Sequence, residues 1–302
     1  MFKTASLLFS AYTVSLLLSL SLPLSIRSQT HGASVECTPS CGNINIRSPF
    51  RLQGDPGYCG NKAYTLSCET NETSQSHHAV LYLFCGKYYV QAINYINYTI
   101  RVVDAGVHKI KDNYFSDPVY PLSYFNFSED YSDPYTIYYE YFESPDASFS
   151  FTKYLTVPLV FLSCTNPMNL SNLFVETAPC IGSHSSSDSS LSTVYSYFKL
   201  GRLDKYGYPD MSPADVGLSC TITLMVMVSP TPAPTDKYSQ SCEGIYKHLA
   251  YGFELSWLPH ECTEKCRSEY YGCAVNHNNT GIECYNPIQG GRPEILNYLK
   301  NV

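Results

Sequence analysis

The sequence of 302 residues lacks the motifs of several well-known enzyme classes. It contains no glycine-rich phosphate loop, no His-Arg-Asp and no Asp-Phe-Gly, so the catalytic machinery of a protein kinase is missing. The Gly-x-Ser-x-Gly turn that carries a hydrolase nucleophile is also absent. We therefore expect a protein that is not an enzyme.

Long hydrophobic runs are scarce as well. The stretch from Ala5 to Leu24 carries no charge, and it lies between Lys3 and small polar residues at 25–28. This pattern is typical of a signal peptide, to which we assign residues 1–28. An uncleaved membrane anchor is the alternative, because about 20 apolar residues can span a bilayer. The best later candidate, Thr221 to Val228, suits a strand and is too short for a span.

Basic residues are missing from one region. Residues 112–152 hold eight acidic side chains and no lysine or arginine, whereas residues 37–111 hold seven basic and four acidic ones. The chain, with a formal net charge of -7, is thus a mildly basic module followed by an acidic one. The acidic region leaves open a glycosidase with paired carboxylates, although a solvated acidic surface accounts for the same composition.

Cysteine, by contrast, is abundant. All thirteen cysteines follow the N-terminal run, together with five Asn-x-Ser/Thr sequons. Behind a signal peptide, this combination indicates the secretory route and an oxidising compartment. We expect N-linked glycans at Asn71, Asn97, Asn126, Asn169 and Asn278. We expect disulfide bonds at Cys37, Cys41, Cys59, Cys68, Cys164, Cys180, Cys220, Cys262, Cys266, Cys273 and Cys284.

An odd number of cysteines leaves one without a partner in the same chain. We predict that this is Cys85, which ends an alternating strand on the same face as Leu81 and Leu83, where a small apolar thiol needs no partner. Cys242 is the next candidate and could bridge two chains. A zinc site would have to use the C-terminal cysteines with His260 and His277, but an oxidising compartment favours disulfides, so we expect no metal.

Apolar alternation predicts a three-stranded meander from Ala79 to Val103, with breaks at Gly86 and at residues 94–97. Tyrosine and phenylalanine are frequent at residues 112–160, where prolines cut the chain into short strands and long loops. The fold class is therefore mostly β: a disulfide-rich, glycosylated secreted ectodomain with a small cysteine-rich C-terminal module.

A more specific pattern runs from Cys37 to Val103. Its elements are Cys41-Gly42, Ile46-x-x-Pro49-Phe50, Cys59-Gly60 and Leu66-Ser67-Cys68. In this order and spacing they resemble the galacturonan-binding domain of plant wall-associated receptor kinases, nearest to the leaf-rust-resistance type. We assign residues 37–104 to such a module and residues 105–228 to its β-rich, aromatic and acidic continuation.

A proline-rich linker at residues 229–241 leads to the C-terminal part. There the run Gly252 to Trp257 and the cysteines after it resemble the small C-terminal module of wall-associated kinases, to which we assign residues 242–302. The resemblance implies a transmembrane helix and a kinase after the ectodomain, and neither occurs in this sequence. We expect a soluble ectodomain-like product or the product of a truncated gene.

The resemblance implies non-catalytic binding of cell-wall polysaccharide, above all pectin. Galacturonate carries a carboxylate, which Arg and Lys pair with, and its ring can stack on an aromatic side chain. The candidate ligand-binding residues are Arg47, Arg51, Lys62, Lys87, Tyr89 and Arg101. Lys87 and Arg101 share a face with Tyr89 only if the strand registers allow it.

Galacturonan is therefore the expected partner, with a membrane receptor kinase or a second copy of the chain as candidate protein partners. We expect no cofactor and no nucleic acid. The expected location is secreted, in the cell wall or at the outer face of the plasma membrane. The alternatives are a secreted pectin-modifying glycosidase and a receptor ectodomain for a peptide or protein.

Overall fold

The computed structural model describes residues 36–70, 75–111, 114–127, 133–142, 150–168, 174–177, 194–203, 209–210, 219–230, 241–266, 272–278 and 281–285. The expected signal peptide, the sequons at Asn71 and Asn169, Cys180 and most of the proline-rich linker lie outside these residues. Strands dominate the described residues and disulfide bonds connect them, which confirms the mostly β, disulfide-rich fold class.

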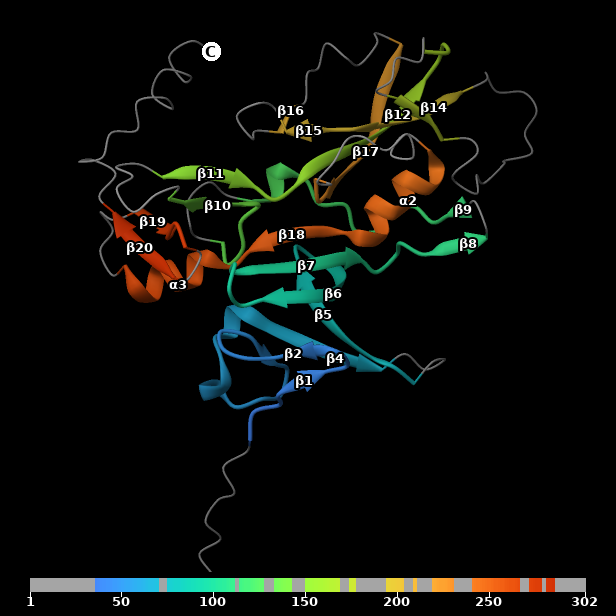
Figure 1. The fold of residues 1–302 in the computed structure, drawn as a ribbon. Helices are drawn as coiled ribbons and strands as arrows, with labels where there is room; N and C mark the ends of the chain where they lie inside the picture. Colours follow the sequence, from blue (N-terminus) through green and yellow to red (C-terminus); the bar gives the residue numbers. More distant parts are fainter. Residues whose placement is uncertain are drawn as a thin grey trace, which may run out of the picture. The chain divides into compact units, whose positions relative to one another are not determined.

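The largest sheet has six strands in the order β18-β7-β6-β5-β4-β3 (Figure 1). Neighbours are antiparallel except β3 and β4, which are parallel. The expected meander corresponds to β5, β6 and β7, so that prediction is confirmed. The strands are β3 (Arg51–Leu52), β4 (Thr65–Thr70), β5 (His77–Leu83), β6 (Gly86–Asn94), β7 (Thr99–Asp104) and β18 (Phe253–Ser256).

The turn between β5 and β6 lies one residue earlier than the sequence predicts. Leu83 pairs with Gly86, so Phe84 and Cys85 form a two-residue turn, with φ of 48° and 65°. Both angles are positive, as in the type I′ turn that matches the twist of a hairpin. Gly86 is already the first residue of β6. Cys85 therefore belongs to a turn and not to a strand face beside Leu81.

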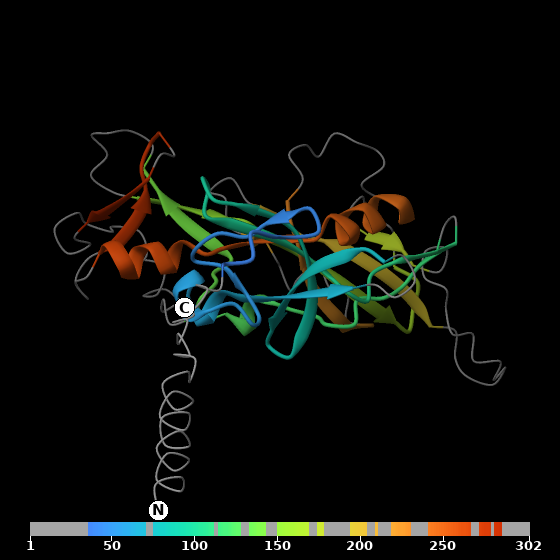
Figure 2. The same ribbon diagram turned by 90° about the horizontal axis from the view of Figure 1, so that it is seen from below.

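The outermost strand, β18, comes from far along the chain. It pairs with β7, with Phe253 opposite Val102 and Ser256 opposite Thr99. Helices α2 (Cys242–Tyr251) and α3 (Leu258–Lys265) flank it in sequence, and Figure 2 shows them on either side of it. The sequence does not predict these helices. Residues assigned to the C-terminal module thus complete the sheet of residues 37–104, while the division into domains stays a prediction.

Gly252 makes the connection between α2 and β18 possible. Its φ is 83°, in the region that glycine enters without steric cost. A Cβ atom at this position would lie 2.0 Å from the Val102 carbonyl oxygen, so no side chain fits between the turn and β7. At the other end of α2, the Ser241 hydroxyl accepts a hydrogen bond from the Gly244 amide at 3.1 Å and caps the helix.

One face of the six-stranded sheet is the centre of a hydrophobic core. Leu66, Leu81, Tyr88 and Ile100 point into it, and all four are almost fully buried. Trp257, directly after β18, closes this core and lies edge-to-face with Phe50, Tyr95 and Tyr98. The opposite face of the sheet carries polar and aromatic side chains together with the buried valines Val80 and Val103.

A second sheet has four antiparallel strands in the order β13-β14-β12-β17. Its central strand β12 reads Val-Pro-Leu-Val-Phe-Leu-Ser-Cys, and seven of its eight residues are buried. Ile245 and Leu249 of α2 pack against one of its faces. The strands are β12 (Val157–Cys164), β13 (Phe174–Glu176), β14 (Tyr195–Leu200) and β17 (Cys220–Val228).

The remaining strands form smaller sheets. In the order β11-β10-β19-β20, four strands combine the middle of the chain with its C-terminal part, and β10 is parallel to β19. Their bounds are Tyr138–Tyr141 (β10), Phe151–Tyr154 (β11), Gly272–Val275 (β19) and Ile282–Tyr285 (β20). Three two-stranded ribbons are β1 (Ser40–Cys41) with β2 (Ile44–Asn45), β8 (Lys109–Lys111) with β9 (Tyr114–Phe115), and β15 (Arg202–Leu203) with β16 (Pro209–Asp210).

Short 3-10 helices and disulfide bonds complete the described fold. The helices are η1 (Gly57–Cys59), η2 (Lys62–Tyr64) and η3 (Tyr124–Asn126). The disulfides join Cys37 to Cys59, Cys41 to Cys68, Cys164 to Cys220, Cys262 to Cys273 and Cys266 to Cys284. Among the described residues, no helix combines the length and apolarity needed to cross a membrane.

Candidate functional site

The candidate site is the face of the six-stranded sheet that points away from the core, which we call the polar face. Strand register decides its members, because directly paired residues lie on the same side of a sheet. Tyr82 pairs with Lys87, Tyr89 with Val103, and Arg101 with Glu254 of β18. Arg101 is two residues before Val103 on β7, so alternation puts it on the same face as Tyr89, and the register shift in β6 places Ala92 opposite it. The solvent-accessible members of the polar face are Gln53, Ser67, Glu69, His78, Tyr82, Lys87, Tyr89, Arg101 and Glu254, and the buried side chains of Val80 and Val103 lie on the same face among them.

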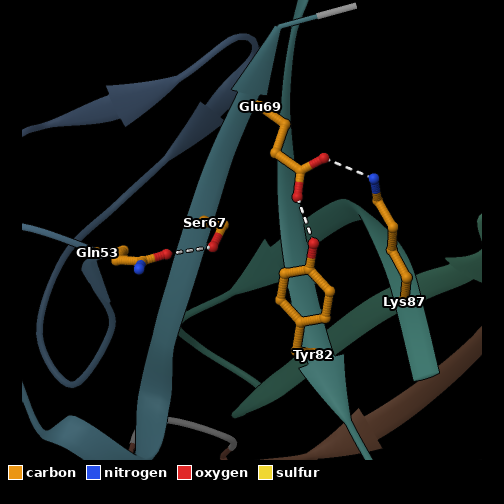
Figure 3. Close-up of polar contacts among 5 residues, drawn as sticks. All are labelled: Gln53, Ser67, Glu69, Tyr82 and Lys87. Carbon is orange, nitrogen blue, oxygen red and sulfur yellow. Dashed lines mark hydrogen bonds and ion pairs between the residues drawn. The ribbon is translucent and has the colours of Figure 1, made fainter. Parts of the chain in front are cut away.

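Glu69 is the hub of the polar face, as Figure 3 shows. The Tyr82 hydroxyl donates a hydrogen bond to its Oε1 at 2.6 Å, and the Lys87 ammonium lies 2.5 Å from its Oε2. The hydrogen bond from Lys87, followed by that from Tyr82, lowers the pKa of Glu69. The same bond raises the pKa of Lys87, so both groups are charged over a wide pH range.

Tyr89 lies at the middle of the polar face, between the imidazole ring of His78 and the ammonium group of Lys87. Its ring centroid is 5.3 Å from that of His78 and 5.8 Å from the Lys87 nitrogen. Beside this group, the Ser67 hydroxyl donates to Gln53 Oε1 at 2.9 Å (Figure 3). These contacts hold aromatic, hydroxyl and amide groups in fixed positions on a surface that solvent reaches.

Arg101 is held at the β7 end of the polar face by the C-terminal part of α2. Its guanidinium lies 4.3 Å from the ring centroid of Tyr251 and donates a hydrogen bond to the Tyr251 carbonyl at 2.9 Å. Stacking on an aromatic ring fixes the plane of a guanidinium and leaves its edge able to meet a carboxylate with two parallel hydrogen bonds. Arg101 therefore has the geometry of an anion-binding group.

The three other basic candidates lie apart from this group. Arg47 is in the loop after β2, with its guanidinium 5.9 Å from the Tyr95 ring centroid. Arg51 shares the sheet face through its pairing with Thr65, but its guanidinium donates to the Asp55 carbonyl and its Nε is buried. Lys62 is exposed in η2. The structure thus brings together Lys87, Tyr89 and Arg101 and leaves Arg47 and Lys62 outside, while Arg51 lies on the same sheet face with its guanidinium bonded to Asp55.

Sequence reasoning missed several members of the polar face. Alternation in β5 puts Tyr82 out of phase with the core residue Leu81, and this signal could have identified it. Glu69 follows in the same way from the burial of Leu66 in β4. Tyr251 carries no such signal, because its place beside Arg101 depends on the pairing of β18 with β7.

Cysteines and sequons are placed as follows. Cys85 is the one free cysteine among the described residues, as predicted, but it is exposed in the β5–β6 turn, so its expected position on a strand face was wrong. Cys242 is disulfide-bonded within the chain, which removes it as a bridge between two chains. The sequon asparagines Asn97, Asn126 and Asn278 are exposed.

The C-terminal cysteines that a zinc site would need are paired with one another in two disulfides. Across the described ranges, no group of three or more His, Cys, Asp or Glu side chains is placed to hold a metal ion. Most acidic residues of the 112–152 region lie outside those ranges. Glu140 is described, is buried, and accepts hydrogen bonds from Ser150 and Tyr285.

Fold and site together define a disulfide-stapled β module with one exposed polar and aromatic sheet face. Residues 37–104 match the family model described as wall-associated receptor kinase galacturonan-binding. The match runs from β1 to β7 with the disulfides Cys37–Cys59 and Cys41–Cys68, and it confirms the resemblance found from the cysteine and glycine motifs. Comparison with curated proteins and with solved structures finds no match.

Proposed function

We propose that this chain binds galacturonan without cleaving it, as a receptor-like ectodomain, and that the polar face is the binding surface. The observation that carries the proposal is the position of Lys87, Tyr89 and Arg101 on one face within or beside strands of the matched domain. Two cations and an aromatic ring on one surface are the groups that an acidic sugar polymer requires.

The spacing of the cations favours a polymer over a single sugar. Lys87 and the partner of Arg101, Ala92, are five residues apart on β6, which is roughly 17 Å of extended strand. One sugar ring cannot contact both cations, whereas consecutive units of a chain can. Between them, Tyr89 offers its ring to the C–H face of a sugar. Arg101 would hold one carboxylate and Lys87 another.

The two cations should contribute unequally. Lys87 already pairs with Glu69, so a ligand carboxylate must compete with that bond. The guanidinium of Arg101 carries five N–H donors, of which one meets the Tyr251 carbonyl, and its plane is fixed by stacking. Arg101 is therefore the main carboxylate-binding group in this proposal, and Lys87 is secondary.

The rest of the expected biology belongs to the same proposal. The disulfides suit an extracellular or cell-wall location. A cleaved signal peptide, glycans at the sequons, and a membrane receptor kinase as partner accord with that location. Arg47, Arg51 and Lys62 stay candidate residues for a longer polymer that extends beyond the polar face.

Calorimetry with a defined oligogalacturonide tests the binding surface. Arg101→Gln should weaken binding roughly tenfold or more, as expected for a charged hydrogen-bonded contact. Lys87→Gln should weaken it about two- to fivefold, the range of an exposed ion pair. Lys153→Gln, which removes the same charge from the exposed side of β11, should change nothing. Equal effects of all three variants would show that only net charge matters.

Two further measurements test the chemistry of binding. Affinity should fall with added salt and with methyl esterification, because both weaken carboxylate contacts. Equal binding to the fully esterified polymer would contradict the proposal. Chromatography of the oligogalacturonide after prolonged incubation separates binding from hydrolysis, since shortened products would support the glycosidase alternative instead.

A further inference from the structure

Glu254 of β18 is a charged member of the polar face to which the proposed function gives no role. Its strand lies outside the matched residues 37–104 and beside β7, at the edge of the six-stranded sheet (Figure 1). Glu254 pairs directly with Arg101, and its neighbours Phe253 and Leu255 are buried in the core on the other face. The partly exposed Glu254 side chain therefore lies next to the main carboxylate-binding group of the proposed site.

Arg101 and Glu254 form no ion pair with each other, although oppositely charged residues at directly paired positions commonly do. The contacts of Arg101 run instead to the end of α2, where its guanidinium lies 4.3 Å from the Tyr251 ring centroid and donates to the Tyr251 carbonyl at 2.9 Å. Among the described residues, the Glu254 carboxylate has no hydrogen-bond or ion-pair partner. A cation and an anion thus lie side by side on an accessible surface, and neither neutralises the other.

The other glutamate of the polar face shows the contrast. Glu69 accepts a hydrogen bond on each of its oxygens, from the Tyr82 hydroxyl and from the Lys87 ammonium, and it neutralises that cation. An ionised carboxylate has about four acceptor sites on its two oxygens, and those of Glu254 are taken by no group of the described chain. Glu254 is therefore the better placed of the two to accept hydrogen bonds from a ligand.

A galacturonate unit presents a carboxylate and several hydroxyl groups on one ring. Arg101 has N–H donors for the carboxylate, and Glu254 has acceptors for hydroxyls. The Cβ atoms of directly opposite residues are about 4.5–5.5 Å apart, so one sugar ring can contact both side chains. A polyanion without hydroxyls gains the arginine contact alone and is repelled by the charge of Glu254.

From this juxtaposition we infer that Glu254 is a specificity-determining residue, which accepts hydrogen bonds from sugar hydroxyls and so selects uronic-acid sugars over other polyanions. The inference rests on the proposed function, because it concerns the same site. It adds that part of the site comes from β18, outside the matched domain.

Calorimetry of the full chain with two ligands tests the inference: an oligogalacturonide, and an oligoglutamate with the same number of carboxylates and no hydroxyls. Glu254→Met keeps the length of the side chain and removes its charge and its acceptors. Binding of the oligogalacturonide should weaken about fivefold, and binding of the oligoglutamate should strengthen about two- to fivefold. The preference for the sugar should therefore fall by roughly tenfold or more.

Two further variants control this measurement. Glu254→Gln removes the charge but retains a carbonyl acceptor, so it should keep part of the preference for the sugar. Glu283→Met, at an exposed position of β20, removes the same charge from another sheet and should change neither affinity. Circular dichroism verifies that each variant is folded.

Tyr251 supplies an independent test, because its ring holds the guanidinium of Arg101 away from Glu254. Tyr251→Leu removes the stacking and should weaken both ligands about two- to fivefold, since Arg101 can then pair with Glu254. Adding Glu254→Met to this variant should restore binding of the oligoglutamate and not that of the oligogalacturonide.

Several results would overturn the inference while the proposed function stands. Equal strengthening of both ligands by Glu254→Met would show that the residue acts through its charge alone, and unchanged affinities would place it outside the contact. In either case Arg101→Gln would still weaken the oligogalacturonide. If the wild type does not bind the oligogalacturonide, or if Arg101→Gln has no effect on its binding, the proposed function fails and this inference fails with it.

Discussion

The six-stranded sheet and the β12 sheet differ in how they use their two faces. In the first, Val80 on the polar face is buried like Leu81 on the core face, but Tyr82, the next residue of the polar face, is 56% exposed. In the second, Leu159 and Val160 are successive residues of β12, and both are buried, in two different hydrophobic clusters. Strand β5 keeps exposed side chains on one face that can contact a ligand, whereas β12 buries the side chains of both faces in hydrophobic clusters. A binding surface can therefore be sought on the first sheet and not on the centre of the second.

The largest expected effect concerns how the first sheet is completed. Trp257→Ala should lower the free energy of unfolding by about 3–5 kcal/mol, because a fully buried ring leaves the core against Phe50 and Tyr95. Urea unfolding followed by circular dichroism measures the loss. Tryptophan fluorescence cannot be used, because Trp257 is the only tryptophan and the variant lacks it. Ile96→Ala, at an exposed position of the β6–β7 turn, is the control. A loss below 1 kcal/mol would mean that the Trp257 ring contributes little to the core of the first sheet.

Pairs of residues on opposite faces of one strand sharpen the comparison of faces. In β12, Leu159→Ala and Leu162→Ala should each cost about 2–5 kcal/mol, although they point to opposite faces. In β5, Leu81→Ala should cost a similar amount, and Tyr82→Ala should leave stability near that of the wild type. Thermal or urea unfolding of the four variants measures the contrast. An equal cost for both β5 residues would contradict the two-faced description of the first sheet.

A buried histidine beside the second sheet predicts a pH effect. Burial lowers the pKa of His248 below its usual 6.5, and a hydrogen bond to the backbone of Ser229 offsets this in part. Below pH 6.5, His248 is protonated in the unfolded chain before it is protonated in the folded chain. The free energy of unfolding therefore decreases as pH falls, by at most about 1.4 kcal/mol per pH unit. Above pH 6.5 the residue is neutral in both states and adds no slope.

Unfolding curves measured between about pH 7.5 and pH 5 test this effect, because these limits bracket the usual histidine pKa of about 6.5. The difference between variants isolates the contribution of His248. His248→Gln should flatten the pH dependence relative to the wild type. His77→Gln, at an exposed position of β5, should leave it unchanged. An identical slope in the wild type and in His248→Gln would show that the buried imidazole is not the titrating group.

The smallest effect belongs to the ion pair on the polar face. A double-mutant cycle with Glu69→Gln and Lys87→Met should give a coupling of about 0.2–1 kcal/mol, because both side chains are about one third exposed. The pKa of Glu69 is lowered, so this coupling is present at neutral pH and is lost as pH falls through the lowered value. A coupling well above this range at high salt would indicate a buried pair instead.

The sequence determined the elements whose signal is local. Period-two alternation gave β5, β6 and β7, and the order of the Cys-Gly motifs identified the domain that residues 37–104 match. The odd number of cysteines required one without a partner in the chain, and Cys85 is the free cysteine among the described residues. Alternation and the Cys-Gly motifs are read within short stretches of sequence, and the cysteine count needs composition alone. None of these signals requires knowing which distant residues are in contact.

Tertiary structure decided everything that joins distant parts of the chain. Only the pairing of β18 with β7 places Tyr251 under Arg101 and Trp257 in the core of the first sheet. Only register shows that Lys87 is paired with Glu69 while Arg47 lies elsewhere. Composition can count basic residues, but the surface that they form depends on long-range strand pairing. That pairing is set by the fit of whole faces, and no short window of sequence contains it.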